Sequence, residues 1–190
     1  MTRIALAPAK GVYRRFVYSQ ARKKVGRDIE PIQVTAHHTA VMNGSIAMEL
    51  AVERSKRVEP QLKHLAGLKA ALLVGCEFCI DIGSSITTES GVPDEKLMAI
   101  PRHREATCFD ERELAVLDYA EAMTRTPAEV TDELFARLRE HFDDAQIVEL
   151  TNEIAWENWR ARFNWAFDIG SAGFTEGQSC PVPLGVPAAR

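Results

Sequence analysis

The sequence has no apolar run near the roughly 18 to 20 residues that a membrane-spanning helix needs, and no strand-like alternation of useful length. Near the N-terminus, charges at Lys10, Arg14 and Arg15 interrupt any stretch that could act as the hydrophobic region of a signal peptide. We therefore expect a protein of the reducing cytoplasm with no membrane partner. In that compartment a close pair of cysteines is more often catalytic or metal-binding than a structural disulfide.

Cysteine is scarce, and its distribution argues against a metal centre. The chain has four cysteines, of which only Cys76 and Cys79 are close in sequence. Cys108 and Cys180 are isolated and there is no second CxxC, whereas a structural zinc needs about four ligands. We expect neither a metal nor another cofactor. A zinc site and an inert pair of core cysteines remain as alternatives.

Acidic residues are missing from the start of the chain, where eight basic residues lie within residues 1–27. Because the whole chain has a net charge of −4, residues 28–190 carry −12. A basic segment can contact phosphates or anionic lipid. This one also contains Val12, Tyr13 and Phe16, which favour burial. We therefore expect it to pack on the acidic body or on a neighbouring subunit, and we expect no nucleic-acid partner.

Apolar residues recur at helical spacing along most of the chain, which predicts an all-α fold with helices packed around one core. Asp110 with Glu113, Thr131, and either Asp143 or Asp144 are predicted to cap helices. Pro31 favours an extended segment at residues 30–34. The remaining segments are expected as helices over 10–24, 36–57, 61–74, 76–90, 93–100, 110–126, 131–141 and 145–170, a loop over 101–109 and an extended tail over 173–190.

The stretch GCEFCIDIG at residues 75–83 contains the cysteine pair and follows an apolar helical segment. If the residues after Gly75 are helical, Cys76 and Cys79 lie on one face and can meet. Cys76 would lie in the first turn, where free N–H groups and the helix dipole favour a thiolate. A thiolate beside a second thiol is the arrangement that dithiol–disulfide redox chemistry requires.

Four segments of the chain resemble the carboxymuconolactone decarboxylase superfamily, in particular its alkylhydroperoxidase D-like branch with a CxxC. They are LAGLKAALLVGCEFCIDIGS at 65–84, GVPDEKL at 91–97, LAVLDYAEAMT at 114–124 and FDDAQIVEL at 142–150. The resemblance implies an all-helical bundle with a helix pair around the CxxC, found as a dimer, trimer or hexamer. It also implies three parts: an N-terminal arm with helices (1–57), a family-like helical domain (58–173) and an extended C-terminal tail (174–190).

The resemblance implies peroxide reduction in which Cys79 attacks the O–O bond and becomes a sulfenic acid, and Cys76 then forms a disulfide with it. An external protein or small-thiol reductant would complete the cycle. The family's peroxidase motif has a glutamate where this chain has His64, and a histidine where it has Gly83. We expect His64 to act as the base, since its ordinary pKa lies near neutrality. The alternative is a half-exposed histidine beside Lys63.

The residues thus predict a thiol-dependent peroxidase or disulfide reductase. A lactone decarboxylase-like acid–base enzyme is one alternative, although its thiols would be idle. A non-enzymatic oligomeric redox sensor is another. Glu77 and Asp81 are expected to point away from the cysteine face. The aromatic and basic cluster at residues 156–165 is expected in the core or at a subunit contact, with an arginine facing an anionic substrate as an alternative.

Overall fold

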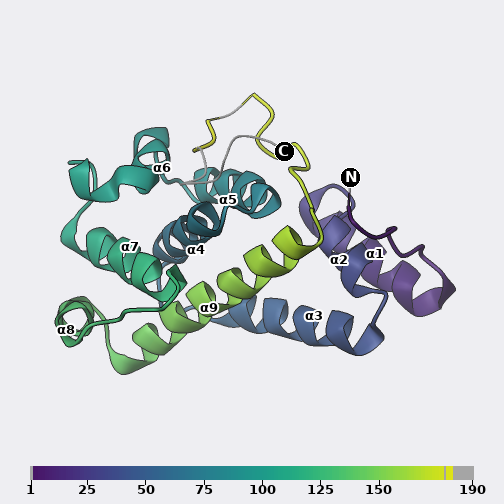
Figure 1. The fold of residues 1–190 in the computed structure, drawn as a ribbon, viewed down its shortest axis with the longest axis horizontal. Coiled ribbons are helices and arrows are strands. Elements are labelled where there is room, and N and C mark those ends of the chain that lie inside the picture. The colour runs from purple at the N-terminus through teal and green to yellow at the C-terminus, as the bar shows by residue number, and fades with distance from the viewer. Residues whose placement is uncertain (1, 178, 182–190) are drawn as a thin grey trace.

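The computed structural model of the chain describes residues 2–177 and 179–181, and every regular element in them is helical (Figure 1). The predicted all-α class is therefore confirmed. None of the helices in this part of the chain is long and apolar enough to cross a membrane. In chain order the elements are α1 (Gly11–Val25), α2 (Glu30–Thr35), α3 (Thr39–Arg54), α4 (Pro60–Val74), α5 (Glu77–Glu89), α6 (Asp94–Ala99), the 3₁₀ helix η1 (Ile100–Glu105), α7 (Glu111–Thr124), α8 (Asp132–His141) and α9 (Asp144–Ala166).

Helix α4 is the centre of the fold and packs against α5, α7 and α9 (Figure 1). Almost all of its length from Leu62 to Leu72 is buried, as expected of a helix that is apolar around most of its circumference. One side of α4 joins a core cluster with the start of α5, and another side joins a second cluster with α7, α8 and α9. The cysteine pair lies in the first of these clusters.

The predicted helix caps are present. Asp110 and Glu113 form a capping box at the start of α7, and Thr131 accepts from the Leu134 N–H at the start of α8. Asp143 forms a second capping box, with Gln146, at the start of α9. These side chains satisfy N–H groups that have no partner inside the helix, so the sequence defines where these helices begin.

Three local predictions were wrong. Residues 30–34, expected to be extended, belong to α2, because Pro31 occupies the first turn of that helix, where its missing N–H is not needed. Residues 101–105, expected as part of a loop, belong to η1, and Pro101 again lies in its first turn. In the tail, residues 174–177 form a turn instead of an extended segment; residues 178 and 182–190 lie outside the described part.

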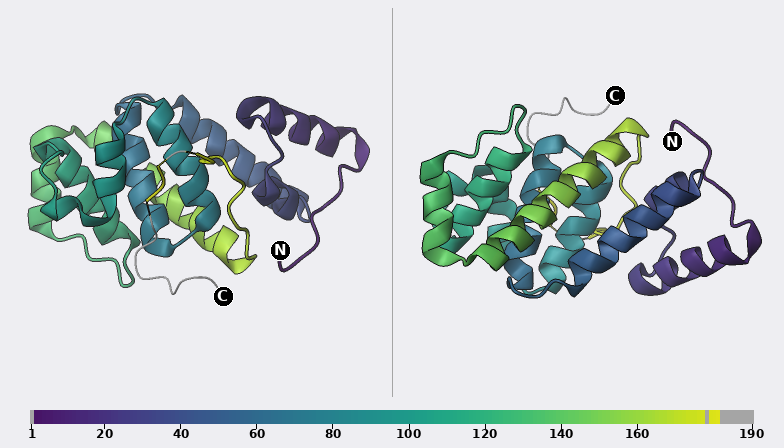
Figure 2. Two further views of the ribbon diagram at one scale, coloured as in Figure 1. Left: turned by 90° about the horizontal axis from the view of Figure 1, so that it is seen from above. Right: turned by 90° about the horizontal axis from the view of Figure 1, so that it is seen from below.

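The basic N-terminal segment contacts the body through a few polar pairs. Lys24 pairs with Glu53 on α3, at 2.7 Å between Nζ and Oε2. Arg27 donates to the carbonyl of Ala172, and its guanidinium lies over the ring of Phe174. Helices α1 and α2 lie at one end of the molecule (Figure 2). The division into parts at residues 57 and 173 stays a prediction.

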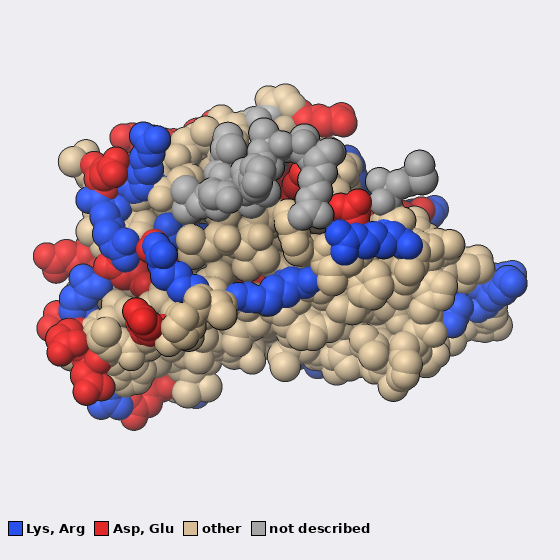
Figure 3. Space-filling view, in the orientation of Figure 1, with Lys and Arg blue, Asp and Glu red and all other residues tan. Residues whose placement is uncertain are grey.

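Some apolar side chains of the N-terminal segment that were expected to be buried are exposed in the single chain. Val17 is buried, but Val12 is 85% exposed and Phe16 is 58% exposed. On α9, Val148 and Trp165 are also exposed. Figure 3 shows charged side chains gathered at the α7–α8 end of this face, and few of them over α9 and α3. The molecule therefore has apolar surface that the single chain leaves uncovered.

Candidate active site

The backbone between α4 and α5 brings the two cysteines together. Gly75 ends α4 in the left-handed conformation, with φ of 77°, which glycine adopts without the cost of a Cβ clash. Cys76 follows as the N-cap of α5, and its Sγ accepts a hydrogen bond from the backbone N–H of Cys79 at 3.2 Å. The two thiols thus lie one helical turn apart on the same side of the helix start.

Helix α9 supplies a buried amide to both sulfurs. The Nδ2 group of Asn164 donates to Sγ of Cys79 at 3.3 Å and lies 3.8 Å from Sγ of Cys76. Asn164, Cys76 and Cys79 are 3%, 1% and 5% exposed. The thiol pair is therefore held between α5 and α9 and is largely shielded from bulk water.

Glu157 on α9 is the carboxyl group beside Cys79. Burial raises the pKa of Glu157 to about 7, because desolvation outweighs the opposing effects of Arg160 and of the Cys79 thiol. Its Oε1 atom is buried without a hydrogen-bond partner among the described residues. A carboxyl group of this kind can take up and release a proton near neutral pH.

The thiol of Cys79 does not gain the acidity that a helix start favours. Burial raises its pKa well above the ordinary value, and the neighbouring Cys76 sulfur and the charge of Glu157 raise it further. The hydrogen bond from Asn164 acts in the opposite direction. The sequence interpretation considered this effect only for Cys76 and did not predict the environment of Cys79. A resting thiol at this position needs a base to remove its proton, and Glu157 is adjacent.

Arg160 is surrounded by carboxylates. Its guanidinium lies 3.2 Å from Glu49, 3.1 Å from Glu153 and 2.9 Å from Glu157. Burial lowers the pKa of Arg160, but the three carboxylates outweigh this effect and raise it. Arg160 therefore balances buried negative charge, and it lines the same cavity as Cys79.

His64 lies on α4, half-buried, and lines the same cavity as Cys79 and Glu157. Its Nδ1 atom is buried without a hydrogen-bond partner among the described residues. Burial lowers the pKa of His64, and the positive charges of Lys63 and Arg160 lower it further. The imidazole is therefore neutral at pH 7, but it makes no hydrogen bond to either thiol in the described part of the chain.

The cavity has a volume of about 1060 Å³ and reaches Cys79 but not Cys76. Exposed side chains such as Lys56 and Glu89 border it, so it is open to solvent. Gly83, where the family motif has a histidine, also lines it, and a Cβ there would lie 3.5 Å from Leu68 Cδ1. A molecule entering from solvent therefore meets Cys79 first.

Asp81 holds the C-terminal segment over α5. Its carboxylate accepts hydrogen bonds from the backbone N–H groups of Ala172, Phe174 and Thr175 and from the hydroxyls of Ser171 and Thr175, all between 2.8 and 3.0 Å. Burial opposes ionisation, but these bonds outweigh it and lower the pKa of Asp81 to about 2. Asp81 thus points away from the thiols, as predicted, and positions Phe174 at the cavity.

The residues that the sequence interpretation missed come from α9 and α3. Asn164 and Arg160 were recognised only as part of an aromatic and basic cluster, and Glu49, Glu153 and Glu157 were not singled out. A signal was present, because Glu153, Glu157, Arg160 and Asn164 recur at helical spacing on one face of an otherwise apolar helix. No group of three or more His, Cys, Asp or Glu side chains in the described residues could hold a metal ion.

Part of the chain is similar in sequence to known proteins. A model of the carboxymuconolactone decarboxylase family matches residues 51–122. The uncharacterized protein YnjA of Escherichia coli is 37% identical over 126 residues, which are 66% of this chain and 66% of YnjA. The uncharacterized protein YdfG of Bacillus subtilis is 32% identical over 89 residues, which are 46% of this chain and 60% of YdfG. The matches thus span less than two thirds of each relative's length.

Two solved structures are similar along most of their length. A protein of unknown function from Agrobacterium tumefaciens, suggested to be the antioxidant defence protein AhpD, superimposes with a TM-score of 0.69 at 27% identity, over 73% of this chain and 94% of that one. An uncharacterized peroxidase-related protein from Silicibacter shares the fold, with a TM-score of 0.81 at 21% identity over 93% and 95% of the two chains.

Together, the helical fold and the thiol pair define an alkylhydroperoxidase D-like protein. Residues 51–122 match the model of the carboxymuconolactone decarboxylase family, and the solved structures that superimpose on the chain include AhpD-like and peroxidase-related proteins.

Proposed function

We propose that this protein is a thiol-dependent peroxidase, with Cys79 as the residue that attacks peroxide and Cys76 as the residue that resolves the product. The observation that carries the proposal is the position of Cys79, which lines a solvent-connected cavity with a second thiol behind it and a carboxyl group of pKa about 7 beside it. The resemblance of the fold to peroxidase-related proteins supports this reading.

In the first step, the Cys79 sulfur attacks one peroxide oxygen while Glu157 takes the thiol proton. The O–O bond breaks, Cys79 is oxidised to a sulfenic acid, and the leaving alkoxide or hydroxide takes up a proton. The Asn164 amide, 3.3 Å from the sulfur, would stabilise the developing thiolate. His64 is proposed to exchange protons between this carboxyl group and solvent, because it is neutral and lines the same cavity.

In the second step, the Cys76 sulfur attacks the Cys79 sulfur. A disulfide forms and the sulfenic hydroxyl leaves as water. Two exchange reactions with a dithiol reductant then restore both thiols. The hydrogen bond from the backbone N–H of Cys79 to Sγ of Cys76, at 3.2 Å, supports this step, because it holds the resolving sulfur within one helical turn of Cys79.

The test is peroxide consumption in the presence of dithiothreitol by the wild type and by Cys76→Ser, Cys79→Ser and His64→Ala. Cys108→Ser is the matched control, because Cys108 lies outside the cavity. Loss of turnover in both cysteine variants but not in the control supports the proposal. Stoichiometric thiol oxidation without turnover would instead indicate a sensor. Lactone decarboxylation that survives Cys79→Ser would indicate the acid–base alternative.

We also propose that the protein is a homo-oligomer and that exposed apolar side chains of α1 contribute to the subunit contact. The exposure of Val12 and Phe16 supports this, because a single chain gains nothing from leaving them in water. Light scattering of the wild type and of Phe16→Lys would test it. A wild-type protein that is monomeric at micromolar concentration would rule it out.

A further inference from the structure

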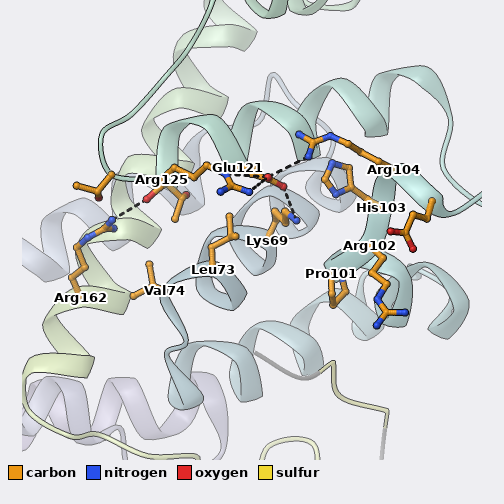
Figure 4. A pocket seen from close by; sticks show the side chains of 13 residues that line it. Lys69, Leu73, Val74, Pro101, Arg102, His103, Arg104, Glu121, Arg125 and Arg162 are labelled. Carbon is orange, nitrogen blue, oxygen red and sulfur yellow. Dashed lines mark hydrogen bonds and ion pairs between the residues drawn. The ribbon is translucent and has the colours of Figure 1, made fainter. Parts of the chain in front are cut away.

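A second cavity, of about 700 Å³, lies on a different face of α4 from the thiol cavity. Lys69 and Leu73 line it from α4, and Arg125 lines it from the end of α7. Pro101 from η1 and Arg162 from α9 form opposite sides of its wall (Figure 4). None of the side chains assigned to the peroxide reaction lines this cavity.

The cavity wall has an excess of positive charge, although the chain as a whole is acidic. Its lining includes five basic side chains and two acidic ones, which leaves three positive charges in excess. The basic residues are Lys69, Arg102, Arg104, Arg125 and Arg162, and the acidic ones are Glu105 and Glu121. A concave surface of one sign concentrates small ions of the opposite sign.

Glu121 cannot neutralise the cations around it. Its carboxylate accepts from Lys69 at 3.0 Å and Arg104 at 3.2 Å, and it also accepts from Arg125 (Figure 4). Burial opposes its ionisation, but these three cations outweigh burial and lower the pKa of Glu121 to about 2. Arg104 is also shared with Asp118, at 2.7 Å. The positive potential therefore persists after the internal ion pairs are counted.

The guanidinium of Arg162, also in this wall, donates hydrogen bonds to uncharged groups. Its Nη2 donates to the carbonyl of Thr124 at 3.0 Å, and its Nη1 contacts Asn158. No carboxylate pairs with it in the part of the chain that the structure describes. A guanidinium without a carboxylate partner at the edge of a cavity can bind an anionic group through two N–H donors.

The remaining wall is apolar, because Leu73, Val74 and Pro101 face the same space. We propose that this cavity binds a small organic anion, with its carboxylate or phosphate group at Arg162 and Arg125 and its apolar body against Leu73, Val74 and Pro101. The proposal is independent of the peroxidase function, because none of the thiol-site residues takes part.

Phenyl phosphate is a suitable probe, since it combines a dianionic group with a compact apolar ring. Calorimetric titration of the wild type should show saturable binding with one molecule per chain, and phenol should not bind. Inorganic phosphate should bind more weakly than phenyl phosphate. Arg162→Gln should weaken phenyl phosphate binding about tenfold or more, as expected for a lost charge-assisted contact. The variant also loses the hydrogen bonds to Thr124 and Asn158, so its thermal unfolding is measured as well, and weaker binding by a variant that is fully folded at the titration temperature supports the proposal.

Arg54→Gln is the matched control, because Arg54 is exposed and does not line the cavity. It should leave binding unchanged. A second variant, Thr126→Glu, adds a negative charge at an exposed position of the cavity wall and should also weaken binding. Absence of saturable binding to the wild type would overturn the proposal. Equal weakening by Arg54→Gln and Arg162→Gln would also overturn it, because the interaction would then be only a general effect of charge.

Discussion

Asn164 and Cys79 are joined by a hydrogen bond of 3.3 Å from the side-chain amide to the sulfur, although they are far apart in sequence. The contact links the last turns of α9 to the first turn of α5. It is one of the few interactions in the site that favour the thiolate, since burial and the charge of Glu157 both oppose it. The reactivity of Cys79 therefore depends on Asn164, a residue of the last helix.

Replacing this donor should make Cys79 less reactive. In Asn164→Ala the thiolate loses its amide partner, so the pKa of Cys79 should rise further. At a fixed pH near 8, alkylation of Cys79 by iodoacetamide should slow by about tenfold, the value of one hydrogen bond to a charged group. The measurement is the pH profile of alkylation in a Cys76→Ser background, followed by mass spectrometry. An unchanged profile would show that the amide has no influence on the thiolate.

Glu157→Gln should separate thiol acidity from turnover. The substitution removes a negative charge that raises the pKa of Cys79, so alkylation should become faster at a given pH. Peroxide turnover should nevertheless fall by about 100-fold, because the proton acceptor is lost. A merely structural role for Glu157 would not move these two rates in opposite directions. If both rates fall together, Glu157 is not the base.

The pH dependence of the wild type follows from the same carboxyl group. A base must be deprotonated to act, so the peroxide consumption rate should rise as the pH increases through about 7, the pKa of Glu157. In Glu157→Gln this rise should be absent. The measurement is initial rate against pH at saturating reductant. A wild-type profile that is flat between about pH 6 and 8 would contradict the assignment.

The sequence predicted the local geometry of the thiols better than their environment. Gly75, Cys76 and Cys79 are close in sequence, so the turn and the common helix face follow from local rules. Glu157 and Asn164 approach the thiols only because α9 packs across α4 and α5, and local spacing does not reveal this packing. The low acidity of Cys79 was missed for the same reason, since burial by α9 outweighs the helix start.

The same distinction applies to the fold. Capping boxes such as Asp110–Glu113 use residues three positions apart, and they were predicted correctly. Pro31 was misjudged because proline both disfavours helix before it and is tolerated in a first turn. Tertiary contacts decide between these two effects.

Asp81→Asn should loosen the C-terminal segment and destabilise the fold. The free energy of unfolding at pH 7 should fall by about 2 kcal/mol, because several hydrogen bonds to a buried carboxylate are weakened or lost. Folding lowers the pKa of Asp81 from 3.8 to about 2. Its contribution is therefore full above about pH 4 and disappears as the pH falls toward about 2. The difference between wild type and variant, measured by urea unfolding, should shrink over this range.

The exposed Asp132 provides a control for that experiment. Asp132→Asn should change the free energy of unfolding by less than about 0.5 kcal/mol at either pH. If Asp81→Asn is no more destabilising than this control, the carboxylate does not hold the segment in place.

The buried pair of Lys69 and Glu121 should respond asymmetrically to substitution. Lys69 is 1% exposed, and burial lowers its pKa despite Glu121. Glu121→Gln should destabilise the protein by about 3 kcal/mol, because it leaves a buried ammonium without a counter-charge. Lys69→Met should cost clearly less, because Arg104 and Arg125 still pair with Glu121. Urea unfolding of the two variants checks this order, and the reverse order would contradict it.

The assignment of Cys79 as the attacking residue can be tested by trapping its oxidised form. One equivalent of hydroperoxide would be added to Cys76→Ser and, separately, to Cys79→Ser, each in the presence of dimedone, and the adducts located by mass spectrometry. The account predicts a dimedone adduct on Cys79 in Cys76→Ser and no adduct on Cys76 in Cys79→Ser. An adduct on Cys76 in the second variant, with none on Cys79 in the first, would contradict it.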